Sequence, residues 1–328
     1  MQSAVSAYRV LGPLSRASES FWSAVGEIFS DHYAEARASV PAAERAPRYK
    51  ELCLAARARV GGALIAAAKV ELFTGGAVLR SLAVAPHARR AGVGSALLSS
   101  LLARAAAAGA RVVSAELPPP RSGAGGEELL RGAGFVVDFV RERWGGGDAH
   151  EDEWRVYLSR VLSGDTAPPP KPPPAGVLLA DAQPWDEEVG AFLAAHSEAS
   201  EDFAFAVLAG GEDAGSAAAA AAAAASASAA ELLACCAGRI ESGALHIGVL
   251  VVRKEWRRRG VGAVLLARAE ALAAARGCHA IAVETFCFQA PLFYEAYGYA
   301  RDYSLRGWSA GAELLYYSKR LLPPAPSV

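Results

Sequence analysis

A six-residue pattern occurs twice in this chain of 328 residues, once in each half. Residues 89–94 read Arg-Arg-Ala-Gly-Val-Gly and residues 257–262 read Arg-Arg-Arg-Gly-Val-Gly, so both have the form Arg-x-x-Gly-x-Gly. The offset is 168 residues at each matched position: 89 to 257, 92 to 260 and 94 to 262. Each copy follows an apolar run and precedes an Ala/Leu-rich run. We therefore interpret the chain as a tandem repeat of one nucleotide-binding domain.

The chemistry of this loop favours phosphate binding. A helix N-terminus offers unpaired N–H groups and a partial positive charge, and glycines let the backbone approach an anion closely. The alternative is a Rossmann dinucleotide turn, in which the first glycine follows the strand almost directly and a third glycine follows. Here several residues separate the strands Leu82–Val84 and Leu250–Val252 from the glycines, and Leu97 and Leu265 replace the third glycine. The Rossmann interpretation is therefore disfavoured.

The second half carries a longer pattern. The apolar run 245–252 precedes its loop, and residues 290–294, Ala-Pro-Leu-Phe-Tyr, followed by Gly298-Tyr299, close it. This order resembles the GNAT superfamily of N-acetyltransferases, strongly in the second half and mainly at the glycine loop in the first. The resemblance implies an α/β fold with mixed sheets, arranged as two tandem GNAT domains joined by a Pro-rich linker.

The expected domain boundaries follow from composition. They are an N-terminal GNAT-like domain at 1–165, a Pro-rich linker at 166–176 and a C-terminal GNAT domain at 177–322 with a low-complexity Ala insertion at 209–230. A run of prolines favours an extended spacer. We expect residues 7–11 to form the first strand of the first domain, and residues 177–180 to form the first strand of the second.

The remaining elements follow from periodicity and turn residues. Strands are expected at residues 51–60, 63–73, 79–84, 111–117, 135–142, 154–161, 203–208, 232–240, 245–252, 280–286, 299–306 and 313–320. Helices are expected at residues 19–38, 94–108, 127–132, 187–196, 262–276 and 291–297. The order repeats between the two halves, as a tandem duplication requires.

The resemblance implies acetyl-CoA as co-substrate, with its pantetheine arm paired to the strand before the loop, where a bulge splays that strand from its neighbour. The expected cofactor-binding residues of the second half are Leu250, Val251, Val252, Arg257, Arg258, Arg259, Gly260, Val261, Gly262 and Ala263. Those of the first half are Leu82, Val84, Arg89, Arg90, Gly92 and Gly94. No metal is expected.

The resemblance also suggests the catalytic residues. Tyr294 matches the tyrosine that protonates the departing coenzyme A sulfur, and its alternative role is a packed core aromatic. Counting back equally from Gly134 places Leu130 at this position in the first half, and leucine donates no proton. The N-terminal domain is therefore expected to be catalytically degenerate. Where many relatives have an asparagine seven residues before the tyrosine, this chain has Cys287.

The general base is open between several groups. Glu284, at the end of the strand facing the cofactor, is either the base or a substrate-binding carboxylate. His246, on the preceding strand, lies near the position of a catalytic glutamate in other members, and a structural role is its alternative. A chain of water molecules is a third possibility. An amine with a reference pKa of about 10 must lose a proton before it attacks.

Composition narrows the function classes. A net charge of −1 makes nucleic acid an unlikely partner, and the longest apolar tract is a short alanine run, which predicts no membrane span. Five cysteines without metal-ligand spacing indicate reduced thiols and a cytoplasmic protein. The first 18 residues lack acidic side chains, which leaves organelle targeting open. The oligomeric state is not indicated.

The sequence therefore predicts an N-acetyltransferase that moves an acetyl group from acetyl-CoA to an amine by direct attack, with the C-terminal domain active. The acceptor is a small-molecule amine or a protein amine, including the case of histone or ribosomal lysines. The alternative is a non-catalytic acyl-CoA-binding or protein-interaction module with a regulatory role.

Overall fold

The computed structural model describes residues 8–11, 21, 23–28, 50–73, 75–117, 125–141, 155–162, 170–183, 186–196, 200–209, 232–241, 243–308 and 311–321. The first half contains β1 (Tyr8–Leu11), β2 (Lys50–Ala58), β3 (Leu64–Phe73), β4 (Gly76–Val84), α2 (Val93–Ala107), β5 (Val112–Leu117), α3 (Gly126–Gly132), β6 (Val136–Arg141) and β7 (Arg155–Val161). The second half contains β8 (Val177–Ala182), α4 (Glu187–His196), β9 (Ser200–Ala209), β10 (Leu232–Glu241), β11 (Ala244–Val252), α6 (Val261–Ala275), β12 (Ala280–Phe286), α7 (Pro291–Ala296), β13 (Ala300–Leu305) and β14 (Leu314–Arg320).

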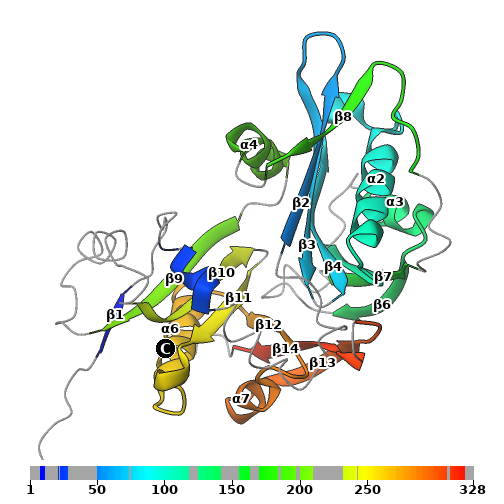
Figure 1. The fold of residues 1–328 in the computed structure, drawn as a ribbon. Helices are drawn as coiled ribbons and strands as arrows, with labels where there is room; N and C mark the ends of the chain where they lie inside the picture. The colour runs from blue at the N-terminus through cyan, green and yellow to red at the C-terminus, as the bar shows by residue number, and fades with distance from the viewer. Residues whose placement is uncertain are drawn as a thin grey trace, which may run out of the picture.

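These elements form two mixed-sheet α/β domains (Figure 1). The first sheet has the strand order β6-β7-β5-β4-β3-β2-β8, and the second has the order β1-β9-β10-β11-β12-β14-β13. In each sheet one parallel pair, β4–β5 or β11–β12, joins otherwise antiparallel strands. The two orders correspond strand for strand, which confirms the predicted fold class and tandem arrangement.

The two domains exchange their first strands. β1 pairs with β9 of the second sheet, with Tyr8 opposite Ala209, and β8 pairs with β2 of the first sheet, with Val177 opposite Ala58. The expectation that each half supplies the first strand of its own sheet is therefore wrong, although both strands form where predicted. Alternation of side chains identifies a strand but not its partner, because an edge strand pairs with any exposed edge of suitable register.

The adjoining helices are exchanged in the same way. Phe21, Val25 and Ile28, from the helical residues 21 and 23–28, pack on β9, β10 and β11 of the second sheet. In return, Val189 of α4 packs against Cys53, Ala55 and Ala67 of β2 and β3 in the first sheet. Each domain is therefore completed by a strand and a helix from the other half of the chain.

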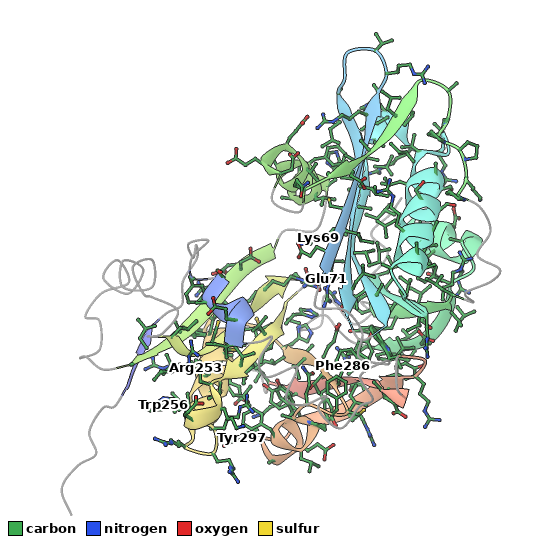
Figure 2. The ribbon with its side chains drawn as sticks, viewed as in Figure 1. Lys69, Glu71, Arg253, Trp256, Phe286 and Tyr297 are labelled. Atoms are coloured by element: carbon green, nitrogen blue, oxygen red, sulfur yellow. The ribbon has the colours of Figure 1, made fainter. Side chains whose placement is uncertain are left out.

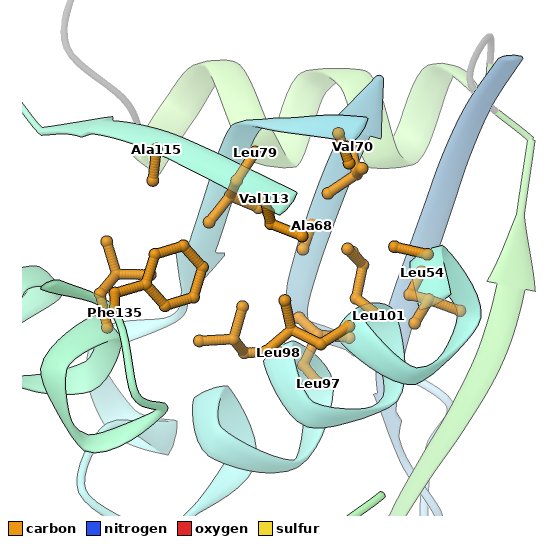
Figure 3. Packing of buried hydrophobic residues seen from close by; sticks show 14 of the residues in the cluster. Leu54, Ala68, Val70, Leu79, Leu97, Leu98, Leu101, Val113, Ala115 and Phe135 are labelled. Carbon is orange, nitrogen blue, oxygen red and sulfur yellow. The ribbon is translucent and has the colours of Figure 1, made fainter. Parts of the chain in front are cut away.

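Each sheet is covered by its own long helix. In the first domain, α2 directs leucines at positions 97, 98 and 101 onto the sheet, where they meet residues of β2, β3, β4 and β5 (Figure 3). In the second domain, α6 packs Leu265, Leu266 and Ala269 onto β9, β10, β11 and β12. The spacing of these residues gives each helix one apolar stripe, and burying it holds the central strands in place.

The two sheets meet through a second apolar cluster. It joins β4, β5 and β7 to β12, β13 and β14, and its members are Val78, Val112, Tyr157, Phe286, Leu305, Trp308, Ala312, Leu314 and Tyr316. Phe286 lies where the second sheet approaches the first (Figure 2). At the centre of this cluster, Tyr157 and Tyr316 pack edge to face with ring centroids 5.1 Å apart. Tyr157 lies opposite Glu116 of β5, and Tyr316 lies opposite Glu284 of β12. The contact between the two rings therefore joins equivalent positions of the two repeats.

Most predicted elements are confirmed within a few residues, although β4 begins at Gly76, three residues before its expected start. The Ala-rich insertion after Ala209 and most of the predicted helix at 19–38 lie outside the described residues. Of the proposed linker only residues 170–176 are described, and its boundaries stay a prediction. Among the described helices, none is long and apolar enough to span a membrane.

Candidate active site

One inserted residue interrupts the central strand of each sheet. Between β10 and β11, Ala237 pairs with Val249 and Gly238 with Ile247, so Gly248 is the extra residue. Between β3 and β4 the extra residue is Arg80, which lies 168 positions earlier. A Cβ on Gly238 would lie 1.8 Å from the His246 carbonyl oxygen, so this approach requires glycine. Such bulges re-aim a strand and end its pairing.

The bulge opens the parallel strand pair. β11 pairs with β12 only over residues 244–247, and β4 pairs with β5 only over residues 77–79. Beyond these points the segments Leu250–Val252 and Leu82–Val84 have no partner on this side among the described strands. Their backbone groups form an edge that suits an extended ligand able to pair as a strand. Both segments were predicted to bind the pantetheine arm, and their geometry fits that role.

The glycine loops have the same conformation in both domains. A short 3₁₀ turn, Pro86–Ala88 or Lys254–Trp256, separates the strand from the loop, which explains the spacing that distinguished this motif from a Rossmann turn. Gly92 and Gly260 each have φ of 82° and precede the first residue of α2 and α6. Arg90 and Arg258 also have positive φ, 62° and 57°.

The last glycine of each motif faces the neighbouring short helix. A Cβ on Gly262 would lie 3.5 Å from Phe293 of α7 and 3.7 Å from Val252 of β11. In the first domain, Gly94 has the same relation to Leu129 and Val84. The strand, the loop and the short helix therefore lie close together at this glycine. The loop therefore fits a phosphate-bearing arm in both domains.

The arginines of the motif divide their roles. Arg257 donates from Nε to the Val252 carbonyl at 3.0 Å, and Arg89 does the same to Val84 at 3.1 Å, so the first arginine anchors the loop to its strand. Arg258 and Arg259 are exposed, and the Arg259 guanidinium lies 5.2 Å from the Trp256 ring centroid. The exposed pair is the part of the motif available to an anionic ligand. Their predicted contact with coenzyme A stays a prediction.

Tyr294 projects from α7 into the core of the second domain. Its ring packs against Phe293, Tyr299 and Tyr317 at centroid distances of 5.3, 5.8 and 6.3 Å, and burial raises the pKa of its hydroxyl. The hydroxyl therefore stays protonated at neutral pH. Its counterpart Leu130 is buried at the equivalent point of the first domain, and a leucine side chain donates no proton.

Glu284 lies on the face of β12 that points toward the first sheet. Its side chain is 24 % exposed, and Oε2 lies 3.5 Å from Nη1 of Arg80 on β4. Burial raises the pKa of Glu284, while the positive charge of Arg80 opposes that rise and the negative charge of Glu116 adds to it. A carboxylate with a raised pKa and solvent access is suited to accept a proton.

The equivalent carboxylate of the first domain has the opposite environment. Glu116 is the counterpart of Glu284, 168 residues earlier, and its Oε1 accepts hydrogen bonds of 2.9 Å from both Arg155 and Tyr157. Burial is the largest single influence and would raise the pKa of Glu116, but the charges of Arg155, His246, Arg239 and Arg141 together outweigh it and hold the pKa well below its usual range. In the second domain Leu314 of β14 occupies the position that corresponds to Arg155, so this position supplies no cation to Glu284.

His246 is enclosed between the two domains. Its Nε2 lies 3.8 Å from Glu241, which also accepts a hydrogen bond of 3.1 Å from Arg155 of the first domain. Burial is the main reason that the pKa of His246 is lowered to about 3, with Glu116 and Glu241 opposing the shift. A neutral imidazole with so low a pKa has little proton affinity. This position favours a structural role for His246.

Sequence reasoning did not single out Arg80, Glu116, Glu241 or Arg155. The repeat offset identifies Glu116 once Glu284 is chosen, but the ion pairs between the halves depend on how the sheets meet. Cys287, at the expected asparagine position, is exposed, and its Sγ accepts a contact from the Glu313 N–H at 3.4 Å. Within the described part of the chain, no cluster of three or more His, Cys, Asp or Glu side chains is arranged to hold a metal.

Two protein-family models match the chain, one in each half. The acetyltransferase (GNAT) family model matches residues 19–124, and the acetyltransferase (GNAT) domain model matches residues 219–301. Together these segments cover both glycine loops, so the match supports the correspondence of the two domains independently of their geometry.

Individual relatives match shorter stretches. Blasticidin-S acetyltransferase of Streptomyces morookaense is 40% identical over 75 residues, 23% of this chain and 55% of that protein. An acetyltransferase of Agrobacterium fabrum is 34% identical over 83 residues, 25% of this chain and 61% of that protein. The match thus spans about half to three fifths of these relatives. Among solved structures, an acetyltransferase of Bacillus cereus aligns with 25% identity and a TM-score of 0.30, over 38% of this chain and 76% of that chain.

Proposed function

Because the chain belongs to the GNAT superfamily, with one GNAT domain in each half, we propose that it is an acetyl-CoA-dependent N-acetyltransferase whose second domain performs the reaction. The acyl donor binds along Leu250–Val252 and the Arg257–Gly262 loop. The first domain keeps the loop and the bulge but does not catalyse transfer.

One observation carries this assignment: the two equivalent carboxylates lie in environments that shift their pKa values in opposite directions. Glu116 has a lowered pKa and accepts hydrogen bonds from Arg155 and Tyr157, whereas Glu284 has a raised pKa and is partly exposed to solvent. Titratable groups whose environments push their pKa values in opposite directions often mark a division of roles. The replacement of the tyrosine by Leu130 in the first domain points the same way.

The proposed roles follow from these positions. Glu284 accepts a proton from the acceptor ammonium, so that the free amine can attack the thioester. Tyr294 donates its hydroxyl proton to the departing thiolate, and the opened backbone of β11 orients the acyl donor. We propose Glu284 rather than His246 as the base, because the lowered pKa of His246 leaves it little proton affinity.

The acceptor class is tested with a panel of amines. Release of free thiol from acetyl-CoA is measured with blasticidin S, which the name of the Streptomyces relative suggests, and with polyamines, aminoglycosides and lysine peptides. Acceptor-dependent thiol release supports an acetyltransferase. Coenzyme A binding by calorimetry without turnover on any amine would instead favour a non-catalytic binding module.

Replacing Gly260 with valine is expected to weaken coenzyme A binding about tenfold or more. A Cβ at Gly260 would meet no atom within 4 Å, so valine creates no clash with neighbouring residues. Because φ is 82°, however, a β-branched residue strains the backbone of the loop. Such strain costs about 1–3 kcal/mol, and about 1.4 kcal/mol corresponds to a tenfold change in Kd. Isothermal titration measures the effect, and Gly92→Val is the matched variant for the first domain. Unchanged affinity in a folded Gly260→Val protein would contradict the assigned loop.

Replacing Tyr294 with phenylalanine is expected to lower kcat by about tenfold or more and to leave the KM for acetyl-CoA nearly unchanged. General acid catalysis contributes roughly 10²–10⁴-fold, and a thiolate leaves fairly well unaided, so we expect the low end. Tyr317→Phe is the control, because it removes a neighbouring hydroxyl that donates to Glu295 at 2.6 Å. It should reduce stability and not kcat. If acetyl transfer is rate-limiting and Tyr294→Phe has the same kcat as the wild type, Tyr294 is not the general acid.

A further inference from the structure

The bulge of the first domain carries a side chain that its counterpart lacks. Arg80 is the inserted residue of β4, and the equivalent residue of β11 is Gly248. In the second domain the bulge exposes only backbone. In the first domain it presents a guanidinium toward the second sheet.

Arg80 connects one carboxylate of each domain. Its Nε donates to Oε2 of Glu71 on β3 at 2.7 Å, and its Nη1 lies 3.5 Å from Oε2 of Glu284 on β12. The side chains of Arg80, Glu71 and Glu284 are 25 %, 17 % and 24 % exposed, so solvent reaches all of them. Glu71 lies on the side of β3 that faces the second domain (Figure 2). The shorter contact anchors Arg80, and the longer one leaves Glu284 open to a second partner.

We propose that Arg80 is a positioning residue of the second domain's acceptor site, through which the first domain orients Glu284 and favours its deprotonated form. This inference rests on the proposed role of Glu284 as base. It gives the catalytically degenerate domain a function, because the acceptor site is then built from both halves of the chain.

The electrostatic surroundings of Glu284 support this role. Facing groups come from six other strands: Glu71, Arg80, Glu116, Tyr157, Arg239 and Tyr316. Arg80 and Arg239 favour the carboxylate, whereas Glu71 and Glu116 disfavour it. Arg239 is held by Glu241 at 2.9 Å, so Arg80 is the cation placed to act directly. An approaching ammonium can displace Arg80 from Glu284 while Arg80 keeps its bond to Glu71.

The test is the protonation of Glu284 in the full chain. Carboxyl ¹³C NMR titration of glutamate-labelled protein follows Glu284, whose signal is the one absent from Glu284→Gln. An opposite charge within about 4–6 Å lowers a carboxyl pKa by roughly 1–3 units, less where solvent screens it. Arg80→Gln should therefore raise the pKa of Glu284 by about half to one unit, and Arg80→Lys should restore most of it. The acidic limb of kcat/KM should move to higher pH by the same amount.

Arg141→Gln is the matched control, since Arg141 also bridges the domains through Asp302 and donates to Tyr157 at 3.0 Å. It should lower the melting temperature without moving the pKa of Glu284. An unchanged pKa in Arg80→Gln, or an equal shift in Arg141→Gln, overturns the inference. Full activity of Glu284→Gln would instead overturn the proposed function, whatever Arg80→Gln shows.

Discussion

Replacing Glu284 with glutamine is expected to lower kcat by roughly 10²–10⁴-fold near neutral pH, the usual contribution of a general base. The amide keeps the size of the side chain but accepts no proton, so the acceptor must deprotonate in solution before it binds. Activity should recover in part as the pH rises toward the pKa of the amine, near 10 for an alkylamine. The measurement is thiol release from acetyl-CoA across pH 6 to 10 with an accepted amine.

The same change at Glu116 provides the control. Because Arg155 of the first domain is 3 % exposed and pairs with both Glu116 and Glu241, removing one carboxylate leaves its charge partly unbalanced. Breaking such a buried pair costs up to roughly 3–5 kcal/mol, and the remaining Glu241 reduces that loss. Glu116→Gln should therefore reduce thermal stability and leave kcat near neutral pH close to wild type, while loss of its negative charge moves the acidic limb of the pH–rate profile to lower pH. A comparable loss of kcat in both variants would mean that the first domain also performs chemistry.

Much of this arrangement was predictable from the sequence because it is encoded locally. The Arg-x-x-Gly-x-Gly pattern requires a loop with positive φ, and Gly92 and Gly260 adopt it. Side-chain alternation located the strands around both loops. The repeat offset of 168 residues also identifies Glu116 and Glu284 as equivalent residues, although only the structure shows why their pKa values shift in opposite directions. Arg155 is the strongest of the charges that lower the pKa of Glu116, and it reaches Glu116 from a position 39 residues away in the sequence.

What the sequence did not reveal depends on contacts between the halves. Arg80 reads as an ordinary charged residue in an apolar strand, because nothing near it in sequence indicates the bulge or the carboxylate opposite. For His246 the sequence left a catalytic and a structural role open, and the packing of the first domain against β11, which encloses the imidazole, favours the structural one. Burial set by a distant surface changes the proton affinity of a side chain by more than its neighbours in sequence do.

Placing an aspartate at Val25 is expected to destabilise the second domain, although Val25 belongs to the first half of the chain. Val25 is 4 % exposed and packs on the second sheet, and a buried charge without a partner costs several kcal/mol. A local loss of about 3 kcal/mol corresponds to a more than hundredfold faster exchange of backbone amides, since 1.4 kcal/mol is tenfold. Hydrogen exchange should rise in β9 and β10, and stay close to wild type in β2 and β3.

Val189→Asp is the mirror experiment, because Val189 is 2 % exposed and packs on the first sheet from the second half. Faster exchange should then appear in β2 and β3. If Val25→Asp instead loosened β2 and β3, each half would carry its own helix and the exchange would be absent.

The exchange of strands and helices between the halves also affects the proposed acceptor site. Since Arg80 and Glu284 lie on sheets that each need the other half to be complete, neither half alone presents the ion pair that joins them. Exchange of the first strand and helix thus ties the proposed acceptor site to the intact chain.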